Sequence, residues 1–195
     1  MLDPKKKVRI LGAATDMFAR YGFKKSSIDE IATTAGVGKG TVYLAFDSKE
    51  DLFYQVVHRE IRVCAAQVSE RIDPRKPADE LLVSCSLDTL ERIEAQPLLR
   101  DLVLGRLDRV VPMWRKELED LRAIGRLPTV EVLELGVRQG AFRSDLEVEQ
   151  VARIVQDMQI AGLLLQPRFV RSEDDQRRLG LIWLDLVLNG LMTRD

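Results

Sequence analysis

The chain has 195 residues, of which 46% are hydrophobic and 31% charged, with a formal net charge of −1 at pH 7. This length suits one compact unit or two small subdomains, and the apolar fraction is enough for a buried core. Because no stretch approaches the roughly 18 apolar residues of a membrane span and the first residues lack a secretory core, we expect a cytoplasmic protein with no membrane partner. Cys64 and Cys85 are too few for a disulfide framework and are expected to be reduced and buried.

The charges are unevenly distributed along the chain. Residues 1–50 contain nine lysines and arginines and six acidic residues, a balance of +3, whereas the remainder contains 21 basic and 25 acidic residues, a balance of −4. A basic segment joined to an acidic remainder is typical of a nucleic-acid contact confined to one end. We therefore expect double-stranded DNA to bind residues 1–50.

The first predicted helix starts at Pro4, and its lysines 5–7 are expected to face DNA phosphates. The same run resembles a nuclear-import signal, which is the weaker interpretation. A second helix starts after Ser27, because Ser27 and Glu30 have the spacing of a capping box. Apolar residues follow at helical spacing until Gly36, which is suited to the positive φ that ends a helix.

A further short helix is predicted from Lys39 to about Phe46, with Ser48 capping the next one. Two short helices joined by a glycine turn form a helix-turn-helix, whose second helix can lie in the major groove of DNA. Lysine and tyrosine side chains can reach phosphates, Thr41 can reach base edges, and a glycine allows close backbone approach. The expected DNA-contacting residues are Ser27, Lys39, Gly40, Thr41, Tyr43, Leu44 and Lys49. A helical corner with solvated lysines is the alternative.

Residues 8–57 resemble the N-terminal domain of the TetR family of bacterial transcriptional regulators. The matching residues are Ile10, Ala13, Ala14, Phe18, Tyr21, Gly22, Phe23, Ser27, Ile28, Ile31, Ala32, Ala35, Gly36, Val37, Lys39, Gly40, Thr41, Val42, Tyr43, Phe46, Ser48, Lys49, Glu50, Asp51 and Leu52. The sequence departs from the family at Gly38, where a polar cap is usual, and at Leu44 and Ala45, where a His-Tyr pair is frequent. Leu44 can instead pack on a thymine methyl group.

Beyond residue 48 the pattern is helical throughout. We expect helices at 48–72, from 77 or 78 to beyond Ile93, and at 97–104, 107–123, 128–139, 146–165 and 173–192. The predicted fold is all-α with about nine helices: a three-helix head at residues 1–50 that carries the helix-turn-helix, and a helical bundle at 51–195. The acidic residues of the bundle are assigned to solvated helix faces.

The last two predicted helices carry wide apolar stripes. From the residues alone, these stripes fit a dimer interface and an intramolecular core equally well, whereas in the family such helices form a four-helix interface between two subunits. The expected interface residues are Ile154, Met158, Ala161, Leu165, Trp183, Val187 and Leu191. The resemblance therefore implies a homodimer.

The family also binds effectors among the helices that follow the head. The candidate pocket residues in this chain are Cys85, Ser86, Thr89, Met113, Trp114 and Met158. Ordinary core packing explains each of them as well, but a mostly apolar lining would suit a hydrophobic or aromatic small molecule. The effector itself is unknown.

Catalytic and metal-binding patterns are missing from the sequence. His58 is the single histidine, and it has no cysteine or second histidine near it in the sequence, so we expect no enzyme activity, metal or cofactor. The hypothesis is a DNA-binding repressor that a small ligand releases from a palindromic operator. The alternative is a helical small-molecule binding protein or enzyme with an incidental helix-turn-helix corner.

Overall fold

The structure, a computed structural model, describes residues 3–107, 114, 117–169, 178, 182 and 185–192, without the side chains of 165–169. In these residues the fold is all-α and contains no strand, as predicted, apart from an isolated bridge between Phe142 and Met192. The chain divides into two compact units, Met1–Ile61 with Pro97–Leu99, and Arg62–Gln96 with Arg100–Asp195.

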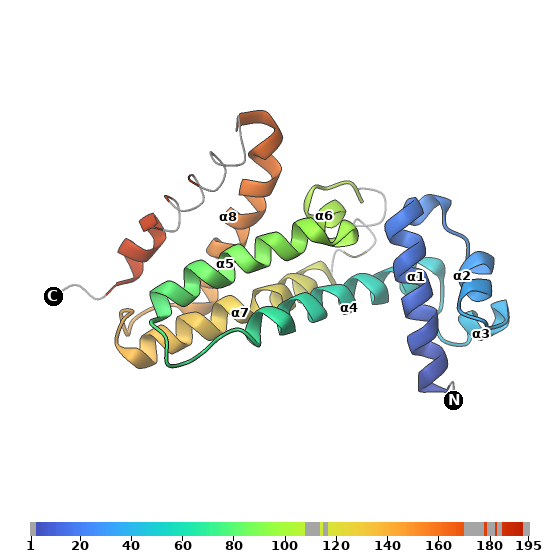
Figure 1. Cartoon of the computed structure of the whole chain (residues 1–195), viewed down its shortest axis with the longest axis horizontal. Coiled ribbons are helices and arrows are strands. Elements are labelled where there is room, and N and C mark those ends of the chain that lie inside the picture. Colours follow the sequence, from blue (N-terminus) through green and yellow to red (C-terminus); the bar gives the residue numbers. More distant parts are fainter. Residues whose placement is uncertain are drawn as a thin grey trace. The chain divides into compact units, whose positions relative to one another are not determined.

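The first unit contains α1 (Pro4–Lys25), α2 (Ile28–Thr34), α3 (Lys39–Tyr43) and the first part of α4 (Lys49–Ser69) (Figure 1). Pro4 stands at the start of α1, where its missing N–H costs nothing, and the Asp3 side chain accepts a hydrogen bond from the Lys5 N–H. Helix α1 is interrupted at Gly22, where φ is 75°, and the Ser26 hydroxyl donates to the Gly22 carbonyl over 2.8 Å. This break turns the chain toward α2.

Apolar side chains from all four helices form the core of the first unit. Phe18 of α1 and Phe53 of α4 are buried, and their rings meet edge to face with centroids 4.8 Å apart. Phe23 extends the contact, with its centroid 5.1 Å from that of Phe53. Each such aromatic pair is worth about 0.5–1.5 kcal/mol beyond its buried area. The other buried residues of the unit include Ile10, Ala14, Ile31, Val42, Leu52, Val56 and Val57.

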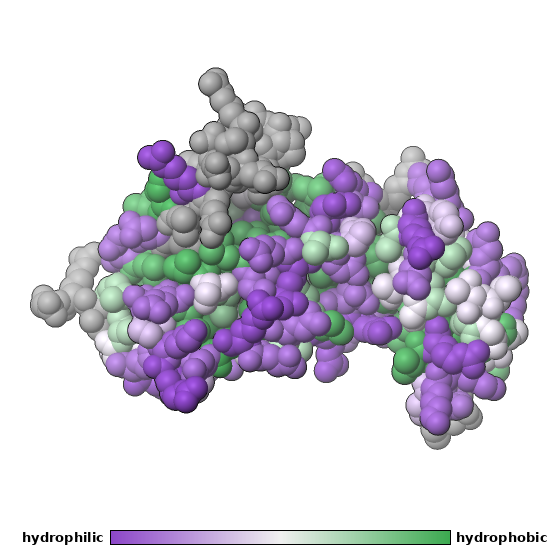
Figure 2. Space-filling view, in the orientation of Figure 1, coloured by the Kyte–Doolittle hydropathy of each residue, from purple (hydrophilic) through white to green (hydrophobic). Residues whose placement is uncertain are grey.

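The second unit is built on α5 (Ala78–Ala95), α7 (Glu117–Gln139) and α8 (Val148–Phe169). Helix α6 (Pro97–Val103) is divided between the units, with Pro97–Leu99 in the first. Helix α5 packs against α7, and α7 packs against α8. The shared core contains Val68, Ala78, Leu81, Leu82, Cys85, Val132, Leu133, Leu135, Phe142, Leu146, Ala152 and Leu191. Figure 2 shows hydrophobic residues gathered along the visible side of α5.

Helix α7 corrects one prediction. The sequence predicts separate helices at 107–123 and 128–139, because a proline disfavours the helical conformation of the residue before it. Instead, α7 runs without a break from Glu117 to Gln139 with Pro128 inside it. Pro128 and Thr129 are buried, so tertiary packing outweighs the lost backbone hydrogen bond. Most of the earlier part of the first range lies outside the described residues.

The end of α7 is closely packed. Gly140 adopts a positive φ of 70°, and the chain turns so that the buried Phe142 ring lies on the backbone of Gly136. The Arg143 N–H then donates to the Leu191 carbonyl over 3.0 Å. Residues 185–191 are helical, while most of the predicted helix at 173–192 lies outside the described residues.

Candidate DNA-binding interface

The two short helices of the first unit are joined as the sequence predicts. Ser27 Oγ accepts a hydrogen bond from the Glu30 N–H, and the Glu30 carboxylate accepts one from the Ser27 N–H, both over 3.2 Å, which confirms the capping box. Gly36 has a φ of 63°, and the Val37 N–H donates to the Ala32 carbonyl. The glycine turn therefore ends α2 by the hydrogen bonding typical of a helix C-terminus.

Arg9 of α1 fixes this turn. Its guanidinium donates to the carbonyl oxygens of Ala35 and Gly36, the second over 3.1 Å. These carbonyls lie at the end of α2, where a cation is favoured by the helix dipole. A Cβ atom at Gly36 would lie 2.5 Å from the Arg9 guanidinium, so the glycine also makes room for this contact. No sequence pattern indicates this pairing, because the partners are 26 residues apart.

Helix α3 buries one face and exposes the other. Val42 is buried, as is Phe46, whose N–H donates to the Val42 carbonyl in a turn that continues past the end of α3. On the other side Tyr43 is exposed, and Leu44 is 80% exposed at the helix end. An apolar side chain this exposed gains nothing from the chain's own core, so Leu44 is free to contact a partner. As predicted, Gly38 provides no side-chain cap for α3.

The lysines of the head have weak internal partners. Lys39 Nζ lies 2.8 Å from the Asp29 carboxylate, which raises the pKa of Lys39, and both side chains are exposed. Lys49 Nζ lies 4.4 Å from the centroid of the Phe23 ring, and Lys7 Nζ lies 5.4 Å from that of Phe46. Solvent screens such contacts, so each ammonium group can exchange its partner for a phosphate.

The structure brings most of the predicted DNA-contacting residues together. Lys39, Gly40, Thr41 and Tyr43 lie on α3, and Leu44 follows directly. Ser27 precedes α2 and Lys49 begins α4, so both stand at helix N-termini, where backbone N–H groups favour phosphate oxygens. All of these residues belong to the first unit.

The candidate pocket residues lie in the second unit. Cys85 and Ser86 are buried on α5, and the Thr89 hydroxyl donates to the Cys85 carbonyl over 2.8 Å. Burial raises the pKa of the Cys85 thiol to about 11, with a smaller contribution from the Asp88 and Glu131 carboxylates, so the thiol stays protonated at neutral pH. Trp114 is buried and Met158 is exposed. Met113 lies outside the described residues.

Two of the predicted interface residues are prominent on the surface. On α8, Ile154 is 55% exposed and Met158 is 47% exposed, and they are one helical turn apart. Ala161 is half-buried on the same helix. Val187 packs beside the core of its own unit and Leu191 is buried in that core. Trp183 and the side chain of Leu165 lie outside the described residues.

The described residues contain neither a metal-binding cluster nor a membrane-spanning helix. No group of three or more histidine, cysteine and acidic side chains is close enough to hold a metal ion within the described part of the chain. Among the helices that the structure describes, none combines the length and the apolar character needed to cross a membrane.

Comparisons with known proteins agree with this geometry. The profile described as "Bacterial regulatory proteins, tetR family" matches residues 10–56. The HTH-type transcriptional repressor KstR2 of Rhodococcus jostii (strain RHA1) is 28% identical over 163 residues, which cover 78% of this chain and 75% of that protein. This relative is named for transcriptional regulation and not for catalysis, in agreement with the prediction that the chain is not an enzyme.

Solved structures share the fold. A transcriptional regulator from Cytophaga hutchinsonii is 21% identical with a TM-score of 0.72, covering 94% of this chain and 97% of that one. FadR from Bacillus subtilis, solved in complex with stearoyl-CoA, is 20% identical with a TM-score of 0.70, covering 94% and 98%. At these identities the likeness concerns the fold.

Proposed function

We infer the function of this chain from its membership of the tetR family of bacterial regulatory proteins. It is a DNA-binding transcriptional regulator, and we propose that it is a repressor, as KstR2 is named. The observation that carries the proposal is the exposed face of α3, where Tyr43 and Leu44 are presented to solvent while Val42 anchors the helix in the core. A short helix held in this way can enter the major groove as a rigid body.

We propose further that two copies bind one palindromic operator. A two-fold symmetric dimer places its two recognition helices in successive major grooves, about 34 Å apart. Ile154 and Met158 support a dimer built on α8, because exposed apolar side chains one turn apart form a stripe that a second copy can cover. Such a regulator acts where the bacterial chromosome lies, so we place it in the cytoplasm.

The effector is proposed to be a small hydrophobic or aromatic molecule that binds the second unit. Ser86 supports this proposal, because its buried hydroxyl has no hydrogen-bond partner among the described residues. Buried hydroxyl groups are normally paired, so a ligand atom or a water molecule is expected to satisfy it. The other proposed contacts, Cys85, Thr89 and Trp114, supply an apolar to weakly polar lining. Release from the operator requires the effector to favour one of two conformations of the dimer.

Two substitutions in the head separate phosphate contacts from base contacts. Lys49→Ala is expected to weaken binding to all duplexes alike and to reduce the salt slope by about 1, because a phosphate contact carries no base information. Leu44→Ala is expected to leave the salt slope unchanged and to relax the preference at one thymine position. Affinities are measured by fluorescence anisotropy on duplexes selected from a random library, over a range of salt concentrations.

Lys76→Ala, at an exposed lysine of the second unit, is the matched control and should leave the slope unchanged. Circular dichroism is needed to check that Lys49→Ala is folded, because the variant also loses its contact with the Phe23 ring, worth about 0.5–1 kcal/mol. Unchanged affinity and slope in Lys49→Ala would mean that the proposed docking of the head is wrong.

A further inference from the structure

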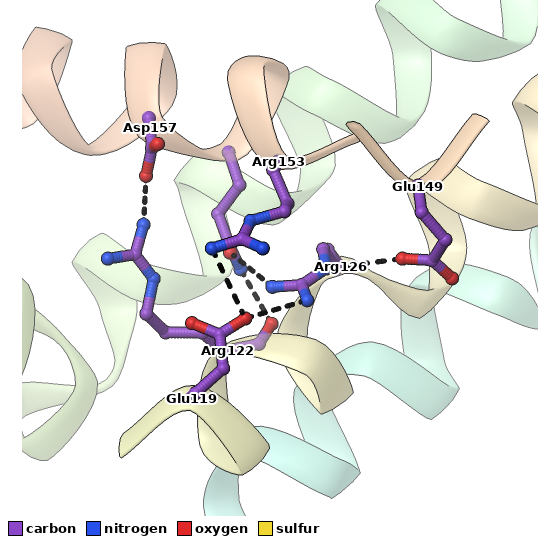
Figure 3. Close-up of polar contacts among 7 residues, drawn as sticks. Glu119, Arg122, Arg126, Glu149, Arg153 and Asp157 are labelled. Carbon is purple, nitrogen blue, oxygen red and sulfur yellow. Dashed lines mark hydrogen bonds and ion pairs between the residues drawn. The ribbon is translucent and has the colours of Figure 1, made fainter. Parts of the chain in front are cut away.

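A cluster of charged side chains joins the facing sides of α7 and α8 (Figure 3). We call it the arginine cluster; it consists of Arg122, Arg126 and Arg153 with Glu119, Glu149 and Asp157. The Gln156 side chain of α8 bonds to two arginines of α7: it accepts a hydrogen bond from the Arg126 guanidinium and donates one to the Arg122 carbonyl over 2.9 Å. The three acidic side chains are exposed, as the sequence predicts, and they are also paired with arginines.

Arg126 is the buried member of the cluster. Its side chain is 8% exposed, and one terminal nitrogen donates to the Glu119 carboxylate over 2.8 Å. Its Nε makes no hydrogen bond in the described residues, because the nearest carboxylate oxygen, on Glu149, is 3.6 Å away. A guanidinium has five N–H donors and no acceptor, so a buried one is costly unless these donors are satisfied.

The unsatisfied groups near this position are all donors. Arg122 Nε is also buried without a hydrogen-bond partner among the described residues, and so is Gln159 Nε2, three residues past Gln156 on α8. A network built only to hold two helices together would be expected to pair its donors. Arg122 Nε, Arg126 Nε and Gln159 Nε2 are therefore open to further acceptor oxygens, which a ligand can supply.

Glu119 occupies the place that such oxygens would take. Its carboxylate lies 2.8 Å from Arg126 and 3.9 Å from Arg153, and these arginines hold the pKa of Glu119 below its usual range. Glu119 is 49% exposed and stands in the first turn of α7, so its side chain can leave while Arg126 stays in place. An oxyanion can then enter from solvent without a pre-existing cavity.

We propose that the arginine cluster binds the oxyanion head group, carboxylate or phosphate, of an apolar effector, and that this group replaces the Glu119 carboxylate between Arg126 and Arg153. The head group forms charge-assisted hydrogen bonds with the guanidinium groups. A carboxylate takes the two oxygen positions that Glu119 vacates, and a phosphate brings further oxygens that can reach the unpaired Nε atoms. The inference rests on the proposed control by a small molecule and specifies its chemistry: an apolar body with one acidic end.

The test is a calorimetric titration of the full-length chain with four probes: decanoate, decyl phosphate, 1-decanol and inorganic phosphate, all at monomeric concentrations. We expect decanoate or decyl phosphate to bind more tightly than both 1-decanol and inorganic phosphate. Whichever of the two acidic probes, decanoate or decyl phosphate, binds more tightly identifies the head group. Equal binding of 1-decanol, or binding of inorganic phosphate alone, would overturn it.

Two variants locate the site. Arg126→Gln should weaken binding of the acidic probe about tenfold or more, because it removes a charge-assisted hydrogen bond. Glu119→Gln should bind the acidic probe several-fold more tightly, because the competing carboxylate is gone. The probe should therefore raise the melting temperature of Glu119→Gln more than it raises that of the unmodified chain. Arg138→Gln is the matched control, since Arg138 is an exposed arginine of α7 that pairs with Glu134, and it should change nothing.

A purely structural network makes different predictions. It expects Glu119→Gln to melt at a lower temperature with unchanged affinity for the probe, and that result would overturn the proposal even if Arg126→Gln does not fold. The proposed function is tested separately by titrating the selected duplex. If the acidic probe binds through Arg126 without changing DNA affinity, the proposed binding site is kept and the proposal that a ligand controls DNA binding is rejected. If a neutral compound releases the DNA from Arg126→Gln and from the unmodified chain alike, the proposal of ligand control is kept and the arginine cluster is rejected as the binding site.

Discussion

Gly136→Ala is expected to destabilise the second unit by about 2 kcal/mol or more, although alanine is the better helix former by about 1 kcal/mol. A Cβ atom at Gly136 would lie 2.1 Å from Cδ2 of Phe142 and 2.3 Å from its Cε2. The Phe142 ring is buried, so it cannot move aside without disturbing the core of α5 and α7. Urea unfolding at a fixed protein concentration measures the loss.

Gly12→Ala provides the matched control. Gly12 lies within α1, and a Cβ atom placed there meets nothing within 4 Å. Alanine should therefore raise the free energy of unfolding at Gly12 by up to about 1 kcal/mol. If both variants are stabilised alike, Phe142 does not pack on Gly136 as described.

The double substitution Ile154→Glu with Met158→Glu is expected to convert the proposed dimer to monomers. Burying unpaired carboxylates in an apolar helix seam costs several kcal/mol, and about 4 kcal/mol corresponds to a thousandfold weaker association. The affinity for the operator should fall when the dimer dissociates, because each head then binds its half-site alone. Sedimentation velocity at micromolar concentration measures the assembly state.

The pair Val63→Glu with Leu127→Glu is the control for added charge. Both residues are large, exposed and apolar, and they lie on α4 and α7, outside the proposed interface. This variant should remain a dimer. An intact dimer of the Ile154 and Met158 variant would remove this face of α8 as the interface.

Features set by neighbouring residues could be predicted from the sequence. The capping box of Ser27 and Glu30 and the turn at Gly36 depend on contacts three to five residues apart, and the structure contains both. The weak cap at Gly38 is another local property that follows from the residue type alone. The helix-turn-helix was therefore predictable as a unit.

Features that depend on distant residues could not be predicted in the same way. The rule that proline ends a helix failed at Pro128, because packing of its buried face outweighs the local preference. Arg9 binds the end of α2, and Gln139 at the end of α7 bonds to Pro74, Lys76 and Ala78, more than 60 residues away. The arginine cluster likewise joins α7 to residues about 30 positions further on. Such partners carry no shared local pattern.

The most direct test of the central claim is selection of bound duplexes from a random library, followed by titration of the preferred duplex. We expect a palindromic site whose half-sites are centred about one helical turn, 34 Å, apart, with saturable binding that weakens steeply as salt rises. Inserting five base pairs between the half-sites should rotate one of them by about half a turn and abolish tight binding. Selected duplexes that share no sequence, or a site that tolerates the insertion, would contradict a dimer that reads DNA through two copies of α3.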